Sequence, residues 1–313
     1  MSSSSTEPDE YHEQIVAFAL ASVLLSICIC GVLGNAVVLG VGIYKQKYRK
    51  NVTNCFIMNL AVTDLFFLLT SVPLTSYLGL SKLWIFGEFI CKMNIYLAHV
   101  FLQATCYTLA TMSIDRYLHM VHVLWYRKYR TPKHTLIICL SIWIISLLFM
   151  FPYKHVLRMI RRTHTGSRHT LDCSVYDRDS LFSSCIFTFG FYYVLPLSII
   201  AMCYLRVFMR VQSATYHGQK SLVISPCRTN HVKRRRVRRM LLGLTLSFAI
   251  CWLPIHVLEI LNCSQLLSPS LLERHVYILQ IIRMIAHALS YFNSCLNPFL
   301  YALLNKTYFS SHS

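Results

Sequence analysis

The stretch Asn297-Pro298-Phe299-Leu300-Tyr301 interrupts a long apolar segment near the end of the chain. Asparagine brings a polar group to membrane depth, and proline removes a helical hydrogen bond. Five comparable clusters interrupt other apolar segments: Gly34-Asn35, Asn59-Leu60-Ala61-Val62-Thr63-Asp64, Asp115-Arg116-Tyr117, Trp143 and Cys251-Trp252-Leu253-Pro254. A polar group is costly inside a bilayer, so it faces the interior of a helix bundle and marks a functional site. One such residue could be purely structural, but six clusters in six of seven segments indicate a common function.

The composition is that of a protein with several membrane spans. Of 313 residues, 55% are hydrophobic and 13% are charged, and the mean hydropathy is +0.50. A soluble domain of this length is less apolar. Seven apolar stretches reach or nearly reach the ~20 residues that a helix needs to cross the hydrocarbon. They are residues 15–43, 55–80, 89–121, 136–152, 181–208, 240–261 and 276–304. Because the alternating pattern of a β-barrel is absent, we predict an all-α membrane protein, a seven-transmembrane helix bundle.

The distribution of charge predicts the orientation of the bundle. Residues 1–14 carry four acidic residues and no lysine or arginine, whereas basic residues gather in the loops at 45–50, 127–133 and 233–239. The positive-inside rule places these loops in the cytoplasm and the N-terminus outside. An arginine-rich loop after the fourth span opposes this assignment, but the three basic loops and the acidic N-terminal segment outweigh it. We expect three parts: a short extracellular N-terminus (1–14), the bundle (15–304) and a very short cytoplasmic tail (305–313).

The net charge of +18 indicates a membrane surface rather than nucleic acid. The basic run at 233–239 directly precedes the sixth apolar segment. A basic patch beside a membrane span is attracted to anionic lipid headgroups. We therefore expect membrane lipids as partners and no nucleic acid.

Most of the 13 cysteines lie within apolar segments and are expected to be packing residues. Cys91 and Cys173 are exceptions, because both face the predicted oxidising side. A Cys91–Cys173 disulfide is therefore the natural pairing, and it would tie the second outer loop over the mouth of the bundle. Cys185 and Cys263 also lie near the outer surface, but we do not expect a second bridge between them. No cysteine spacing indicates a zinc site.

The motifs together resemble those of the rhodopsin-like (class A) G-protein-coupled receptors, over nearly the whole chain. Within that family the chain is most similar to the kisspeptin, galanin and allatostatin-A group of neuropeptide receptors. The strings that carry this closer likeness are Trp84-Ile85-Phe86-Gly87, Gln103-Ala104-Thr105-Cys106, Arg130-Thr131-Pro132, Ser141-Ile142-Trp143, Ala286-His287 and Ser290-Tyr291-Phe292-Asn293-Ser294.

The resemblance implies an activation mechanism at the cytoplasmic end. Arg116 would be held by Asp115 at rest and freed on activation to meet a G protein, and Leu124 would enter an apolar pocket of its α subunit. Pro254 and Pro298 would provide hinges. The residues implied in activation or coupling are Asp115, Arg116, Tyr117, Leu124, Pro196, Tyr204, Phe248, Trp252, Pro254, Asn297, Pro298 and Tyr301. The alternative is packing: Leu124 within its loop, and Trp252 as a core aromatic residue.

The resemblance also implies a ligand site in the outer half of the bundle. Its expected residues are His99, Leu102, Gln103, Trp252, Ile255, His256, Glu259, Arg283, His287 and Tyr291. The similar receptors bind peptides with amidated apolar ends, sometimes preceded by arginine, so we expect such an end near Trp252 and a basic residue near Glu259. An internal Glu259–Arg283 ion pair is the alternative. Ala98 stands where amine receptors carry aspartate, which disfavours an amine ligand.

Asp64 is a carboxylate at membrane depth, which would either be neutralised or bind a cation. The family geometry surrounds it with Asn35, Thr105, Asn293, Ser294 and Asn297. Their oxygen atoms suit a hard cation. We expect no cofactor apart from an allosteric sodium ion at this site.

These expectations define a multi-pass plasma-membrane receptor for an extracellular, amidated peptide that activates a heterotrimeric G protein. An alternative is a constitutively active receptor or a non-signalling scavenger of the same fold. A transporter or channel would need charged residues along a continuous path, and only Asp64 and Asp115 are acidic in the inner half. A membrane enzyme is disfavoured because no nucleophile–base pair or metal cluster is evident.

Overall fold

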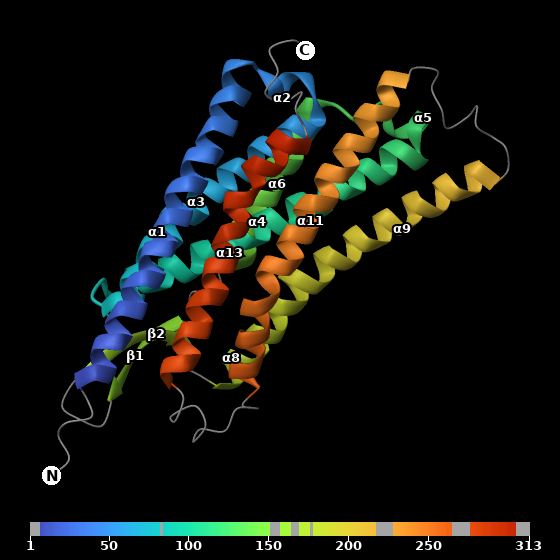
Figure 1. Cartoon of the computed structure of the whole chain (residues 1–313). Helices are drawn as coiled ribbons and strands as arrows, with labels where there is room; N and C mark the ends of the chain where they lie inside the picture. Colours follow the sequence, from blue (N-terminus) through green and yellow to red (C-terminus); the bar gives the residue numbers. More distant parts are fainter. Residues whose placement is uncertain are drawn as a thin grey trace.

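The computed structural model describes residues 7–81, 84–150, 157–163, 169–175, 178–216, 228–264 and 276–304. The long helices are α1 (Glu7–Tyr44), α3 (Val52–Ser81), α4 (Gly87–Val121), α6 (Pro132–Met150), α8 (Arg178–Phe189), α9 (Leu195–Tyr216), α11 (Arg228–Cys263) and α13 (Val276–Leu304). The shorter elements are helices α2 (Lys47–Lys50) and α5 (Val123–Tyr126), the π-helical segment η1 (Gly190–Val194), and strands β1 (Leu157–Thr163) and β2 (His169–Val175). Figure 1 shows the long helices side by side in one elongated bundle.

The bundle confirms the predicted fold class. By length and composition, six of the described helices could cross a membrane. The seventh predicted span, α13, packs between α1 and α11 without meeting that measure of apolarity. Polar residues recur along it every three or four positions: Gln280, Arg283, His287, Ser290, Ser294 and Asn297. This spacing places them on one face of the helix, and the three at its inner end are buried.

The two ends of the bundle are named here after the predicted orientation. The outer end holds the start of α1, the two strands and α8, and the inner end holds α2 and α5 (Figure 1). Figure 1 also shows α9 and α11 diverging toward the inner end. Near the outer end α11 packs against α8, and further inward α9 packs against α4.

The fifth predicted span is not one regular helix. It consists of α8, the π-helical segment η1 and α9 in succession. Pro196 follows η1 and has no backbone N–H to donate, which favours a change in the hydrogen-bond pattern beside it. The sequence analysis predicted the span but not this irregularity.

The second outer loop forms a β-hairpin that the sequence analysis did not predict. Strands β1 and β2 are antiparallel, with Met159 opposite Cys173, and the hairpin packs against α4. Cys91 is disulfide-bonded. The predicted partner, Cys173, lies in β2, but its side chain is outside the described residues, so this pairing stays a prediction.

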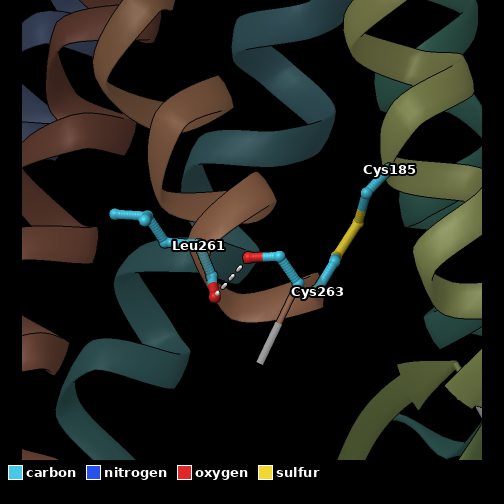
Figure 2. Close-up of a disulfide and its surroundings, with 4 residues drawn as sticks. Cys185, Leu261 and Cys263 are labelled. Atoms are coloured by element: carbon cyan, nitrogen blue, oxygen red, sulfur yellow. Dashed lines mark hydrogen bonds between the residues drawn. A yellow bond between two sulfur atoms is a disulfide. The ribbon is translucent and has the colours of Figure 1, made fainter. Parts of the chain in front are cut away.

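A second disulfide joins Cys185 of α8 to Cys263 of α11, with their Cα atoms 6.6 Å apart. Figure 2 shows the bond crossing between the two helices at the outer end. The sequence analysis did not expect this bridge, and that expectation was wrong. The π-helical segment provides the physical reason, because its wider turns rotate α8 relative to a regular helix. Residue spacing alone therefore does not show which face of the bundle Cys185 takes.

Helix α1 approaches α13 closely at Gly34. A Cβ atom added there would lie 3.0 Å from Cγ and 3.1 Å from Cβ of Pro298. A proline ring cannot rotate away, whereas Gly40 has no atom within 4 Å of its added Cβ. Small residues allow helix backbones to approach in membranes, so Gly34 sets the distance between these helices.

We therefore predict that Gly34→Val lowers the unfolding temperature of the detergent-solubilised chain, at a cost of about 1–3 kcal/mol for overpacking. Gly40→Val is the matched control and should change that temperature much less. Equal effects of both substitutions in a thermal unfolding assay would show that the contact with Pro298 is unimportant.

Candidate functional site

The carboxylate of Asp115 organises the inner end of the bundle. Arg130 donates to both of its oxygen atoms, from Nε at 2.9 Å and from Nη2 at 3.1 Å. The hydroxyl of Tyr126 donates to Oδ1 at 3.1 Å. Burial and the Asp115 carboxylate raise the pKa of Tyr126 to about 12, so this hydroxyl keeps its proton. Bidentate arginine–carboxylate pairs are among the strongest hydrogen-bonded pairs, and Asp115 is thus fixed to the loop that follows α4.

Arg116 is only loosely paired with Asp115. Its Nε lies 3.9 Å from Oδ2 of Asp115, and its Nη2 donates to the hydroxyl of Thr53 in α3. The contact expected from the resemblance therefore exists, but Arg130 holds the carboxylate at hydrogen-bond distance instead. The sequence analysis missed Arg130, Tyr126 and Thr53 as members of this cluster.

A pocket beside Arg116 lies between α4, α9 and α11. Its lining residues are Ser113, Arg116, His119, Met120, Cys203, Tyr204, Val207, Arg238 and Leu241. The structure thus brings the predicted coupling residues Arg116 and Tyr204 together. The lining contains two guanidinium groups and no carboxylate, which gives the pocket a positive potential.

Leu124 is 94% exposed on the short helix α5, and its neighbour Trp125 is 65% exposed. A packing role for Leu124 within its loop does not fit this exposure. Adjacent large apolar side chains at the surface indicate a contact with another molecule or with the membrane.

Polar side chains link the helices at mid-depth. Trp143 of α6 donates from Nε1 to Oδ1 of Asn59 in α3 at 2.9 Å, and Asn59 donates from Nδ2 to the hydroxyl of Thr108 in α4 at 2.9 Å. Two of the clusters singled out in the sequence are therefore partners of each other. Three helices are held in register by this chain of hydrogen bonds.

Asp64 and Asn297 form a second buried link, between α3 and α13. Nδ2 of Asn297 donates to Oδ2 of Asp64 at 2.7 Å. Asn35 donates from Nδ2 to the carbonyl oxygens of Gly31 and Ser294, at 2.9 and 3.0 Å. The Oδ1 atoms of Asp64, Asn35 and Asn293 are buried and accept no hydrogen bond within the described part of the chain. Several unpartnered oxygen atoms around a carboxylate are what a hard cation requires.

Trp252 lies in a continuous aromatic cluster in the middle of the bundle. Its ring centroid lies 6.0 Å from Phe248, 5.6 Å from Phe67 and 6.1 Å from His256. Phe248 stacks on Tyr193 at 6.2 Å, and the hydroxyl of Tyr193 donates to the carbonyl oxygen of Ala249 at 2.7 Å. Through Tyr193 the cluster reaches η1, which ends two residues before the buried Pro196.

Nine of the ten predicted ligand residues of α4, α11 and α13 are buried or half-buried, whereas Arg283 is exposed. Tyr291 stacks on His287 at 6.1 Å and shares a hydrogen bond of 2.7 Å with the hydroxyl of Thr75. Five further members are buried or half-buried, in descending order of depth along their helices: Gln103, Leu102 and His99 on α4, and Ile255 and His256 on α11. In this set of predicted ligand residues, Trp252 and Ile255 are apolar, and the polar side chains of His256 and Glu259 follow them toward the outer end of α11.

Glu259 and Arg283 do not form the ion pair considered as an alternative, within the described residues. Glu259 is half-buried and lies within electrostatic range of His99. Arg283 is exposed and lies near His287, one turn further along α13. The carboxylate of Glu259 is thus not neutralised by α13.

These features define a class of protein: a helical membrane receptor with an interior site near one end and a positive pocket at the other. The profile of the 7 transmembrane receptor (rhodopsin family) matches residues 34–301. The chain belongs to this family. It is accordingly a multi-pass plasma-membrane receptor, and not an enzyme.

Similar proteins come from several animals. The chain is 32% identical to galanin receptor 2b of Danio rerio over 93% of this chain and 73% of that receptor. It is 35% identical to the KiSS-1 receptor of Rattus norvegicus, over 89% of this chain and 70% of that receptor. It is 30% identical to the allatostatin-A receptor of Bombyx mori, over 96% and 80% respectively. The resemblance inferred from the motifs is confirmed.

The Asp115 cluster yields a prediction about ligand-free signalling. Arg130→Gln frees the Asp115 carboxylate to pair with Arg116, which stabilises the resting state. A contact worth about 1 kcal/mol should lower ligand-free nucleotide exchange on a G protein about five-fold. GTPγS uptake by purified heterotrimer measures this rate. Arg127→Gln, at an exposed loop arginine, is the matched control; an unchanged or higher rate in the Arg130 variant alone would contradict the role of Arg130.

Proposed function

We propose that this chain is a cell-surface receptor for an amidated extracellular peptide and that it activates a heterotrimeric G protein. The observation that carries the coupling half is the positive pocket around Arg116 beside the exposed Leu124. The C-terminal end of a helix carries partial negative charge, and a terminal carboxylate adds a full one. A G-protein α subunit that ends in such a helix would fit the pocket, while Leu124 contacts its apolar surface.

The ligand half of the proposal rests on the interior face of α11 and on the names of the relatives. Trp252 and Ile255 form an apolar floor, and Glu259 lies about two turns further out on the same helix. An apolar amidated end would pack against this floor, and a basic residue of the peptide would reach Glu259. The similar proteins are named as receptors for galanin, KiSS-1 and allatostatin-A.

The alternative is a constitutively active receptor, or a scavenger that binds peptide without signalling. The loose Asp115–Arg116 pair favours ligand-free activity over a silent scavenger. A screen of amidated peptides on cells expressing the chain, read by calcium and cAMP, tests the proposal. GTPγS should then lower the affinity of any active peptide, whereas a scavenger's affinity would not respond to nucleotide.

The proposed membrane topology follows the charge pattern. The N-terminus and residues 1–14 lie outside, the bundle spans residues 15–304, and residues 305–313 form a cytoplasmic tail. Anionic lipids would contact the basic residues of the inner loops.

We further propose that Asp64, Thr105, Asn293, Ser294 and Asn297 hold an allosteric sodium ion. The three unpartnered oxygen atoms of Asp64, Asn35 and Asn293 support this site. The ion would supply a positive charge that compensates the buried carboxylate. Since it would tie α3 to α13, it would favour the resting arrangement of these helices.

The sodium proposal predicts that sodium chloride raises the unfolding temperature of the ligand-free chain. An ion that binds only the folded state stabilises that state. N-methyl-D-glucamine chloride at equal ionic strength should not. Sodium should also weaken the binding of an activating peptide about five-fold. Asp64→Asn should abolish both effects. Equal unfolding temperatures in the two salts would remove the proposal.

The role of Glu259 predicts a charge-dependent loss of peptide affinity. Glu259→Gln should weaken a peptide that ends in Arg-Phe-amide about ten-fold, through loss of a partly desolvated charge pair. The same peptide with citrulline in place of arginine should be affected far less. Glu88→Gln, which removes a surface pair with Lys92, is the control. If both peptides lose affinity equally on competition binding, Glu259 is structural only.

A further inference from the structure

The Cys185–Cys263 disulfide stands next to the one acidic residue of the proposed ligand site. The carboxylate oxygen of Glu259 and the sulfur atoms of both cysteines lie within 4.8 Å of one another. Because the two sulfur atoms are bonded to each other, this cluster is not a metal site. It is a covalent link between two helices with a carboxylate held against it.

Cys263 and Glu259 belong to a single stripe along α11. Trp252, His256, Glu259 and Cys263 follow one another at intervals of four, three and four residues, so they share one face of the helix. Cys263, His256 and Trp252 are 6%, 5% and 7% exposed. The stripe therefore faces the interior of the protein, and Glu259 lies between the disulfide and the aromatic floor.

Among the side chains that the structure describes, none forms an ion pair with the carboxylate of Glu259. A half-buried carboxylate without a partner is disfavoured relative to one in water. A helix end that was free to move would relieve this cost by turning Glu259 outward. The bond to α8, one turn beyond Glu259, opposes that movement because it fixes the last turn of α11.

The position of the Cys185–Cys263 bond in the bundle also bears on the ligand site. Helix α11 touches α8 at the outer end, while α9 and α11 diverge toward the inner end (Figure 1). Helices α8 and α11 are thus joined covalently at the outer end, beside the proposed ligand site, whereas α9 and α11 separate toward the inner end. The hydroxyl of Ser264 donates a hydrogen bond of 3.3 Å to the carbonyl oxygen of Leu261 at the end of α11. Figure 2 draws this end of the helix beside the disulfide.

We propose that the Cys185–Cys263 disulfide is a positioning element of the ligand site, which holds the Glu259 carboxylate inward and ready for a cationic group of the peptide. The identity of the ligand in this proposal rests on the proposed peptide function, whereas the position of Glu259 does not depend on it. Preorganisation of this kind raises affinity because the site has less conformational freedom to lose on binding.

The test compares the unmodified chain with the double variant Cys185→Ser and Cys263→Ser. Cys30→Ser, at an exposed free cysteine, is the control. The first readout needs no ligand: the rate at which a water-soluble carbodiimide and glycine ethyl ester label Glu259, measured by mass spectrometry. The labelling rate of Glu259 should rise in the double variant, whereas the rate at Glu88, which is exposed on α4, should stay unchanged. An unchanged rate at Glu259 would overturn the proposal.

The second readout uses two synthetic peptides, one ending in Arg-Phe-amide and its twin with citrulline for arginine. The double variant should lose about five-fold or more of its affinity for the arginine peptide and much less for the twin. Equal losses would show that the disulfide is only structural and would overturn the proposal. If neither peptide binds the unmodified chain, the proposed ligand class fails, and the labelling rate still decides the position of Glu259.

If the double variant does not fold, the folded unmodified protein is treated with dithiothreitol to open its disulfides instead. Alkylation and mass spectrometry then report whether the Cys185–Cys263 bond or the bond of Cys91 has opened. Faster labelling of Glu259 in molecules that have lost only the Cys185–Cys263 bond supports the proposal. An equal rate in bonded and opened molecules overturns it.

Discussion

Polar groups at membrane depth must be matched inside the protein, because the hydrocarbon of a bilayer offers no hydrogen bonds. This constraint joins the helices of the bundle. Asn59 links α3 to α4 and α6 through Thr108 and Trp143, and Asn297 links α13 to Asp64 of α3. Among the buried oxygen atoms that remain unmatched in the described residues are Oδ1 of Asp64, Asn35 and Asn293, the atoms on which the proposed sodium site rests. The same residues thus hold the helices in register and, in the proposal above, would bind an ion that favours one arrangement of α3 and α13.

The two ends of the bundle differ in how firmly helices 5 and 6 are joined. A disulfide connects them at the outer end, and a hydrogen bond from Tyr193 to Ala249 connects them at mid-depth. Toward the inner end α9 and α11 diverge, and the pocket with Arg116 lies between them and α4 (Figure 1). The aromatic cluster of Trp252, Phe248 and Tyr193 lies between the two ends. We propose that a ligand that moves Trp252 would act on α11 between an outer end held by the disulfide and an inner end that has no covalent link to α9 among the described residues, which is a hinge-type arrangement.

The sequence predicted what depends on periodicity and on membrane cost. The spans follow from apolar length, and the inward-facing polar clusters follow from the expense of buried polar groups. The grouping of Asn297 with Asp64 and the position of Trp252 were implied by the family resemblance. Long-range side-chain contacts of the loops do not follow from these rules. Arg130 reaches Asp115 from a loop whose many basic residues look alike in sequence, and only the fold selects one of them. In the hairpin of the arginine-rich loop, apolar and polar residues alternate only over a short stretch of β2, at Leu171, Cys173 and Val175, and the sequence analysis did not use this pattern. The Cys185–Cys263 bond depends on the rotation introduced by η1, which no residue spacing reveals.

We propose that the inner end, with Arg116 in a positive pocket and Leu124 exposed on α5, engages a G protein. The most direct measurement is GTPγS uptake by a panel of purified heterotrimers, in the presence of the chain in lipid nanodiscs, with and without amidated peptides. The account predicts that at least one heterotrimer is accelerated, and that Leu124→Asp abolishes the acceleration without lowering the unfolding temperature. It would be contradicted if no heterotrimer responded, or if the Leu124→Asp chain accelerated exchange as well as the unmodified one.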